Sequence, residues 1–73
     1  MKDYKYLQVY QTIIDDIENG YLKYQEKIPS IRQMAKRLDV SRTTVESAYL
    51  QLLVERYIFA KEKVGYFVDV QYQ

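Results

Sequence analysis

The groups of this chain that could take part in chemistry are hydroxyls, cations and carboxylates, because the sequence contains no histidine, cysteine or tryptophan. One arrangement is Arg42-Thr43-Thr44, in which a guanidinium stands beside two small hydroxyls. An arginine can pair with O6 and N7 of guanine in the major groove of DNA, and a threonine can contact a base, a thymine methyl group or a phosphate. The run is therefore a candidate for reading a DNA sequence.

Further candidates for contact with a nucleic acid lie on both sides of this run. Lys61 and Lys63 precede Gly65, and a glycine allows the backbone to approach a minor groove closely. The complete set of predicted DNA-binding residues is Arg32, Ser41, Arg42, Thr43, Thr44, Ser47, Lys61, Lys63 and Gly65.

Several of these residues have an ordinary structural role as an alternative. Ser41 suits the cap of a helix better than the reading of a base. Lysines such as Lys61 and Lys63 also protect exposed strand edges from pairing with other chains. Glu46 could accept a hydrogen bond from N4 of cytosine, hold Arg42 in place one turn away, or simply face solvent. The sequence does not choose among these three roles for Glu46.

Catalysis is not expected from this composition. Ser–His and Cys–His mechanisms are excluded, and so are zinc sites built from cysteine or histidine. Asp15, Asp16 and Glu18 form a cluster of carboxylates, but adjacent helical residues point apart, which favours a solvated helix end. We therefore expect no enzymatic activity, no cofactor and no small-molecule site within these 73 residues.

The net charge of +1 is unevenly distributed. Residues 27–42 carry five cations and one anion, so this segment has a net charge of +4 and the remainder has −3. A near-neutral total therefore does not exclude DNA, and it predicts weak non-specific affinity for a single copy. No apolar run is long enough to cross a membrane, and the first residues lack the apolar core of a signal peptide, so we expect a cytoplasmic protein.

The spacing of apolar residues predicts three helices, at 5–19, 30–38 and 41–56. The second begins with a capping box formed by Ser30 and Gln33, and the third begins at the cap residue Ser41. Gly20 suits the left-handed end of the first helix. The apolar stripe of this first helix consists of Tyr6, Tyr10, Ile13, Ile14, Ile17 and Tyr21.

The rest of the chain reads as a loop and a hairpin. Residues 21–29 are expected to be a loop. Residues 57–70 contain two short runs rich in aromatic and β-branched residues, separated by a polar segment with a glycine, which predicts a β-hairpin. Two helices joined by a short turn and followed by a hairpin describe a winged helix-turn-helix. The expected fold is therefore one mainly α domain with a small β-hairpin, spanning residues 1–73.

The chain resembles the N-terminal DNA-reading domain of GntR-type bacterial regulators in the order and spacing of its motifs. The matching stretches are Gly20-Tyr21-Leu22, Ile28-Pro29-Ser30-Ile31-Arg32, Val40-Ser41-Arg42-Thr43-Thr44-Val45, Tyr57-Ile58 and Gly65-Tyr66-Phe67-Val68. The run TVESAYLQL together with GYFV is most similar to the MocR-like branch. In that branch this domain is joined to an aminotransferase-like domain that binds pyridoxal phosphate, so the resemblance implies a longer regulator.

The resemblance also implies roles for individual residues. Arg32 would contact the DNA backbone, and Gly65 would reach the minor groove. The side chains that enter the major groove would be Arg42, Thr43 and Thr44. Arg56 stands where the family has a glycine before Tyr-Ile, so we expect this helix end to be capped differently. The loop of the hairpin also lacks the common Gly-Ser-Gly sequence.

Together these observations predict sequence-specific binding of double-stranded operator DNA by the reading domain of a GntR-type transcriptional regulator. One recognition helix covers too few base pairs for genomic specificity, so we expect a homodimer, formed through this or a missing domain, on two half-sites. Leu50 and Val54 lie opposite the apolar stripe of the third helix, where the wing, the first helix, or another subunit or domain could cover them. The alternative function is a winged-helix module that binds protein and not DNA.

Overall fold

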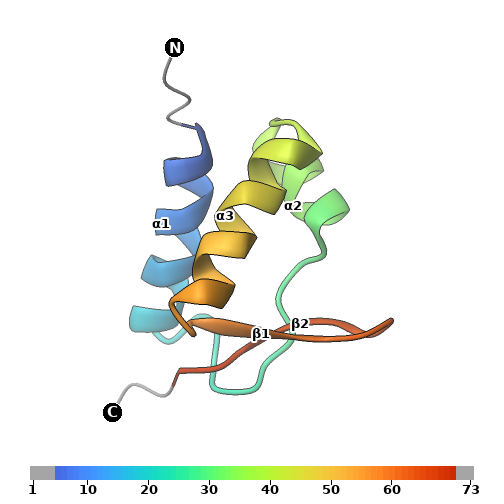
Figure 1. The fold of residues 1–73 in the computed structure, drawn as a ribbon. Helices are drawn as coiled ribbons and strands as arrows, with labels where there is room; N and C mark the ends of the chain where they lie inside the picture. The colour runs from blue at the N-terminus through green and yellow to red at the C-terminus, as the bar shows by residue number, and fades with distance from the viewer. Residues whose placement is uncertain (1–4, 71–73) are drawn as a thin grey trace.

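The structure is a computed structural model that describes residues 5–70, and it contains three helices followed by a two-stranded antiparallel sheet (Figure 1). The elements are α1 (Lys5–Glu18), α2 (Ile31–Leu38), α3 (Arg42–Val54), β1 (Ile58–Lys61) and β2 (Gly65–Val68). This order confirms the predicted winged helix-turn-helix. The helix bounds agree with the prediction to within two residues. The two strands lie within the predicted hairpin of residues 57–70 and leave out residue 57 and residues 69–70 at its ends. None of the helices within residues 5–70 is long and apolar enough to cross a lipid bilayer.

The core lies where α1 and α3 pack against each other, against α2 and against the base of the hairpin. Tyr21 is 75% exposed and does not belong to this core, contrary to the predicted stripe, because the chain has already left α1 at Gly20. Val9, which the stripe did not include, is fully buried. The buried apolar residues are Val9, Ile13, Ile14, Ile17, Ile28, Met34, Ala35, Val45, Ala48, Tyr49, Leu52, Ile58 and Val68.

The two predicted helix starts are confirmed by hydrogen bonds between neighbouring residues. The Ser30 Oγ accepts a hydrogen bond from the Gln33 backbone N–H at 3.1 Å, and the Gln33 Oε1 accepts one from the Ser30 backbone N–H at 3.0 Å. At the start of α3, the Ser41 Oγ accepts from the Thr44 backbone N–H at 3.1 Å. These bonds satisfy amide groups that the first turn of a helix leaves without a partner.

The end of α3 is capped in the way that a glycine usually permits. The Tyr57 N–H donates to the Leu52 carbonyl at 2.9 Å and the Arg56 N–H donates to the Leu53 carbonyl at 3.1 Å, which is the Schellman pattern. Arg56 takes the left-handed position with φ of +65°, just as Gly20 does with +82° at the end of α1. The expectation of a different cap was therefore wrong: Arg56 adopts the left-handed geometry that glycine commonly supplies at a helix end.

Part of the segment 21–29 extends the sheet and is not a simple loop as predicted. Lys27 forms an isolated antiparallel bridge with Phe67, and the Ile28 N–H donates to the Tyr66 carbonyl at 2.9 Å. This stretch lies along the edge of β2 that β1 leaves free. Such pairing joins residues far apart in the sequence, so neither turn residues nor periodicity could have indicated it.

Candidate nucleic-acid interface

The first two turns of α3 present most of the predicted reading residues to solvent. Ser41 sets the residue at which the helix begins, and Arg42, Thr43 and Ser47 follow with exposed side chains. Helical spacing places these three residues on one side of α3. The turn between α2 and α3 is short and is closed by Asp39 in left-handed geometry, with φ of +56°. The structure therefore groups one guanidinium and two hydroxyls on the exposed start of a helix.

Thr44 lies elsewhere, which differs from the expectation that it enters the major groove. Its exposed fraction is 7%, and its Oγ1 lies 2.8 Å from the Ser41 Oγ. In this position the Thr44 hydroxyl faces the Ser41 hydroxyl, whereas Arg42 and Thr43 face solvent. This position favours a role for Thr44 in completing the cap of α3.

The cations of α2 lie on exposed positions. Arg32 stands in the first turn of α2, and Lys36 and Arg37 stand in the last. The last two are also favourably placed for the dipole of their own helix, so a purely structural benefit exists for them. Arg32 has no such benefit, because cations are unfavourable at a helix start. The structure thus leaves the Arg32 side chain exposed at the start of α2.

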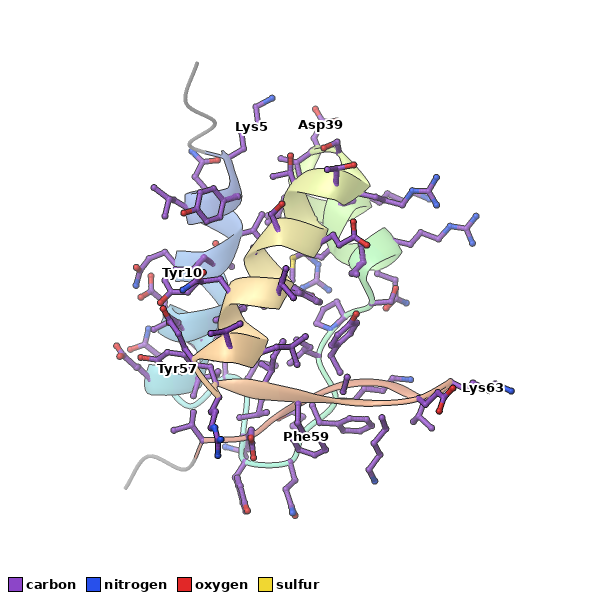
Figure 2. All side chains as sticks on the ribbon, in the orientation of Figure 1. Lys5, Tyr10, Asp39, Tyr57, Phe59 and Lys63 are labelled. Atoms are coloured by element: carbon purple, nitrogen blue, oxygen red, sulfur yellow. The ribbon has the colours of Figure 1, made fainter. Side chains whose placement is uncertain are left out.

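The three predicted wing residues have different surroundings. Figure 2 shows Lys63 at the tip of the hairpin, where its φ of +66° helps to close the loop. The Lys61 Nζ instead lies 5.2 Å from the centroid of the Phe67 ring, which is a cation–π contact. Gly65 has φ of +145°, and a Cβ at this position would lie 2.9 Å from the Lys27 Cε. The positive φ therefore disfavours a residue with a side chain here, and such a residue would also displace the end of the exposed Lys27 side chain.

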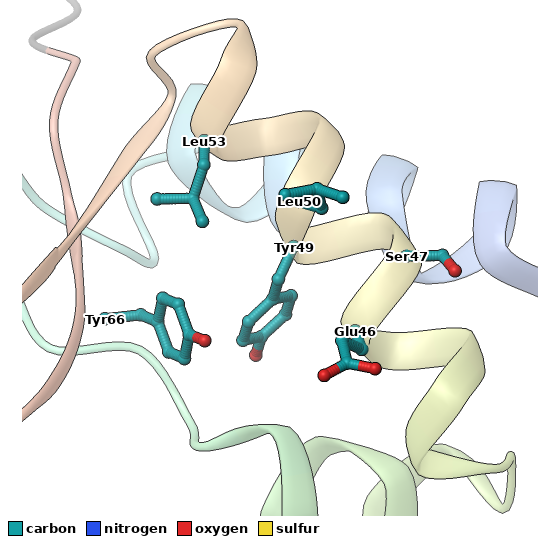
Figure 3. Close-up of a pocket in the computed structure, with 6 residues that line it drawn as sticks. All are labelled: Glu46, Ser47, Tyr49, Leu50, Leu53 and Tyr66. Carbon is teal, nitrogen blue, oxygen red and sulfur yellow. The ribbon is translucent and has the colours of Figure 1, made fainter.

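A groove of about 320 Å³ separates α3 from the hairpin (Figure 3). The rings of Tyr49 and Tyr66 meet edge to face within it, with their centroids 5.1 Å apart. The Tyr49 hydroxyl donates to the Pro29 carbonyl at 2.7 Å, and burial raises the pKa of this hydroxyl above its ordinary value. This contact ties α3 to the residue that precedes α2. The two rings therefore form an aromatic floor of the groove and connect α3 to the wing and to the segment before α2.

The remaining side chains that line this groove are more exposed. Leu50 lines the groove and is 61% exposed. Val54 lies one turn further along α3, outside the groove lining, and is 70% exposed. Neither the wing nor α1 covers these two residues, so both of these predicted sources of cover are ruled out. Glu46 is exposed and forms no ion pair with Arg42 within residues 5–70, which removes one of its three possible roles.

A separate polar network joins α1 to the end of α3. The Tyr10 hydroxyl donates to the Glu55 carboxylate, and the Gln51 Nε2 donates to the other carboxylate oxygen at 2.6 Å. The hydrogen bond to Glu55 is the main reason that the pKa of Tyr10 is raised to about 12, and the same bond lowers the pKa of Glu55. This network lies at the opposite end of α3 from Arg42, so we assign it to the stability of the helix pair.

Two features near the interface were not singled out from the sequence. Lys27 was counted only in the charge of its segment, yet it lies against Gly65 of the wing. The contact between Tyr49 of α3 and Tyr66 of β2 was also missed, because it joins residues from two elements that are distant in the sequence. The presence of a glycine in a strand was the available signal, since it often marks a close approach of another group.

Comparison with known proteins agrees with this geometry. The chain is 41% identical over 64 residues to the HTH-type transcriptional regulator YdeL of Bacillus subtilis, covering 88% of this chain and 14% of YdeL. It is 38% identical over 61 residues to the probable rhizopine catabolism regulatory protein MocR of Rhizobium meliloti, covering 84% of this chain and 12% of MocR. The chain thus spans less than a sixth of the length of these two relatives.

The fold is shared with a solved protein–DNA complex. The crystal structure of the AraR DNA-binding domain with operator ORX1 superimposes with a TM-score of 0.86 and 29% identity, covering 93% of this chain and 81% of that one. The family model described as bacterial regulatory proteins, gntR family, matches residues 5–68, which is nearly all of the sequence. These matches confirm the resemblance drawn from the motifs, the similarity to MocR included. The chain therefore belongs to the GntR family of bacterial regulatory proteins and has the winged helix-turn-helix fold of its DNA-binding domains.

Proposed function

We propose that this chain binds double-stranded operator DNA in a sequence-specific manner, with the start of α3 in the major groove and the hairpin along the adjacent minor groove. The observation that carries this proposal is the exposed group of Arg42, Thr43 and Ser47 at a capped helix start. A guanidinium in this position can pair with guanine, and the hydroxyls can contact bases or phosphates. The solved AraR complex, in which the same fold is bound to an operator, supports this arrangement.

The two arginines that flank the turn have different roles in this proposal. Arg42 reads a base from the start of α3, and Arg32 contacts the backbone from the start of α2. Base contacts carry sequence information, whereas phosphate contacts add affinity that is independent of sequence and sensitive to salt. The pair therefore offers a matched comparison, because each variant removes one guanidinium from an exposed helix start.

The test begins with a duplex selected by the wild-type chain from a randomised library, and with a scrambled duplex of the same composition. Arg42→Ala should relax the preference at one base pair by ~1–3 kcal/mol. Arg32→Ala should weaken binding to both duplexes evenly and lower the slope of log affinity against log salt by about one. Fluorescence anisotropy gives both quantities. Equal losses on both duplexes for Arg42→Ala would contradict its role as a base reader.

We also propose that the functional complex contains two copies of the chain on one operator. A single recognition helix contacts only a few base pairs, which is too little to select one site in a genome. The copies would read half-sites separated by about one helical turn or a multiple of it. Sedimentation equilibrium of the complex with a selected duplex measures the stoichiometry, and one copy per duplex at saturation would contradict this proposal.

The relatives suggest the setting in which this domain acts. They are described as regulatory proteins, and this chain corresponds to a small part of each. We propose that it serves as the reading domain of such a regulator in the cytoplasm, with effector binding and a pyridoxal phosphate site, where one exists, outside these residues. The similarity to MocR supports this setting. Mass spectrometry of the native gene product would test it.

A further inference from the structure

Lys27 stands beside the wing because of the strand pairing that the segment before α2 makes. Its bridge with Phe67 and the neighbouring hydrogen bond from the Ile28 N–H to the Tyr66 carbonyl hold the Lys27 backbone along the free edge of β2. Residues paired across antiparallel strands project to the same face of a sheet, as do residues two apart on one strand. Lys27 therefore shares a face with Phe67 and with Gly65.

The side chain of Lys27 crosses the backbone of Gly65. A Cβ on Gly65 would lie 2.9 Å from the Lys27 Cε and 3.7 Å from its Nζ, so a side chain here would displace the end of the lysine from its place over the backbone. On the other side of the glycine, Lys61 is the residue paired with Gly65 in the register of β1 and β2. Two cationic side chains thus flank a strand position that has no side chain of its own.

These cations are not neutralised by the domain itself. Lys27 and Lys61 are exposed, and neither forms an ion pair within residues 5–70. The Lys61 Nζ is turned to the Phe67 ring, whereas the Lys27 Nζ lies over the glycine. An ammonium group beside a bare stretch of backbone near a hairpin tip suits an anion that must approach closely, and the phosphodiester of a DNA strand is such an anion.

We propose that Lys27 contacts a DNA phosphate beside the wing, from the position over Gly65 in which its side chain lies. The proposal rests on the DNA binding proposed above. It adds to the interface a residue that lies before α2, outside both the recognition helix and the hairpin. A purely structural role, in which the aliphatic stem of Lys27 covers Gly65, is the competing explanation.

The variant Lys27→Met separates these two explanations, because methionine keeps an unbranched stem and removes the charge. Lys23→Met is the matched control: Lys23 lies in the same segment and is exposed, but its Nζ donates to the Gly20 carbonyl at 3.2 Å, away from the wing. Both variants lower the net charge by the same amount. Circular dichroism and thermal unfolding should show that both retain the wild-type fold.

Binding to a short mixed-sequence DNA duplex is measured by anisotropy at about 50 and 200 mM salt. Loss of one phosphate contact lowers the salt slope by about 0.9, so the ratio of wild-type to Lys27→Met affinity should be about 3.5-fold larger at the lower salt. Lys23→Met should leave the slope unchanged. An unchanged slope for Lys27→Met, or an equal change for Lys23→Met, overturns the inference. Failure of the wild-type chain to bind any duplex would instead overturn the proposed function.

Discussion

Arg56 ends α3 in left-handed geometry, with φ of +65°, and this is a testable source of lost stability. A residue with a Cβ loses roughly 1–2 kcal/mol in that conformation, whereas glycine adopts it freely. Glycine also makes the unfolded chain more flexible, which offsets about 0.4–1 kcal/mol of the gain. We therefore expect Arg56→Gly to stabilise the domain by about 0.5–1 kcal/mol. For a domain of this size that corresponds to a rise in Tm of about 2–8 °C.

Two control variants isolate the backbone effect. Arg56→Ala removes the exposed side chain but keeps a Cβ, so its Tm should stay close to that of the wild type. Gly20→Ala makes the reverse change at the end of α1, where φ is +82° and no atom lies within 4 Å of the new Cβ. It should therefore be destabilised by conformational strain alone, by about 1 kcal/mol.

Thermal unfolding followed by far-UV circular dichroism measures all three variants under one condition. An unchanged or lower Tm for Arg56→Gly, combined with a lower Tm for Gly20→Ala, would refute the reasoning. That result would mean that the Arg56 side chain stabilises the helix end by more than the left-handed conformation costs.

Two further predictions concern the cap of α3 and the network at its other end. Ser41→Ala should lower stability by ~0.5–2 kcal/mol in urea unfolding, because the Ser41 Oγ accepts from the Thr44 N–H; unchanged stability would contradict its role as a cap. The pKa of Tyr10 is raised from 10.0 to about 12, so its contribution to stability is complete below pH 10 and is lost as the pH rises through 12. Tyr10→Phe should therefore show a smaller fall in Tm between pH 9 and pH 11 than the wild type. An identical fall in both proteins would show that the hydrogen bond to Glu55 does not control this titration.

The helix starts and the order of elements could be read from the sequence because they depend on neighbouring residues. Ser30, Gln33 and Ser41 form their caps within three residues, so the pattern of residue types already contains the interaction. Gly20 likewise marks a helix end through its own backbone freedom. The exposed position of Arg42 followed from helical spacing once the start of α3 was known.

Other features of the interface depended on which surfaces pack together. Thr44 had the residue type of a base reader, but the packing of α3 buries it beside Ser41. Arginine as a residue type does not indicate left-handed geometry, and the available signal at Arg56 was the glycine that the family has there. Lys27 had no distinguishing neighbour in the sequence, and only its pairing with Phe67 brings it to the wing.

The sequence by itself determined the winged helix-turn-helix order, the caps of α2 and α3, and the cations and hydroxyls available to DNA. Local hydrogen bonds and the spacing of apolar residues are sufficient for these, because each links residues at most about one turn apart. The tertiary structure decided which of the candidate side chains face outward and which cations meet at the wing. These outcomes depend on burial and on strand pairing between distant segments, and a single sequence does not encode them in any short-range pattern.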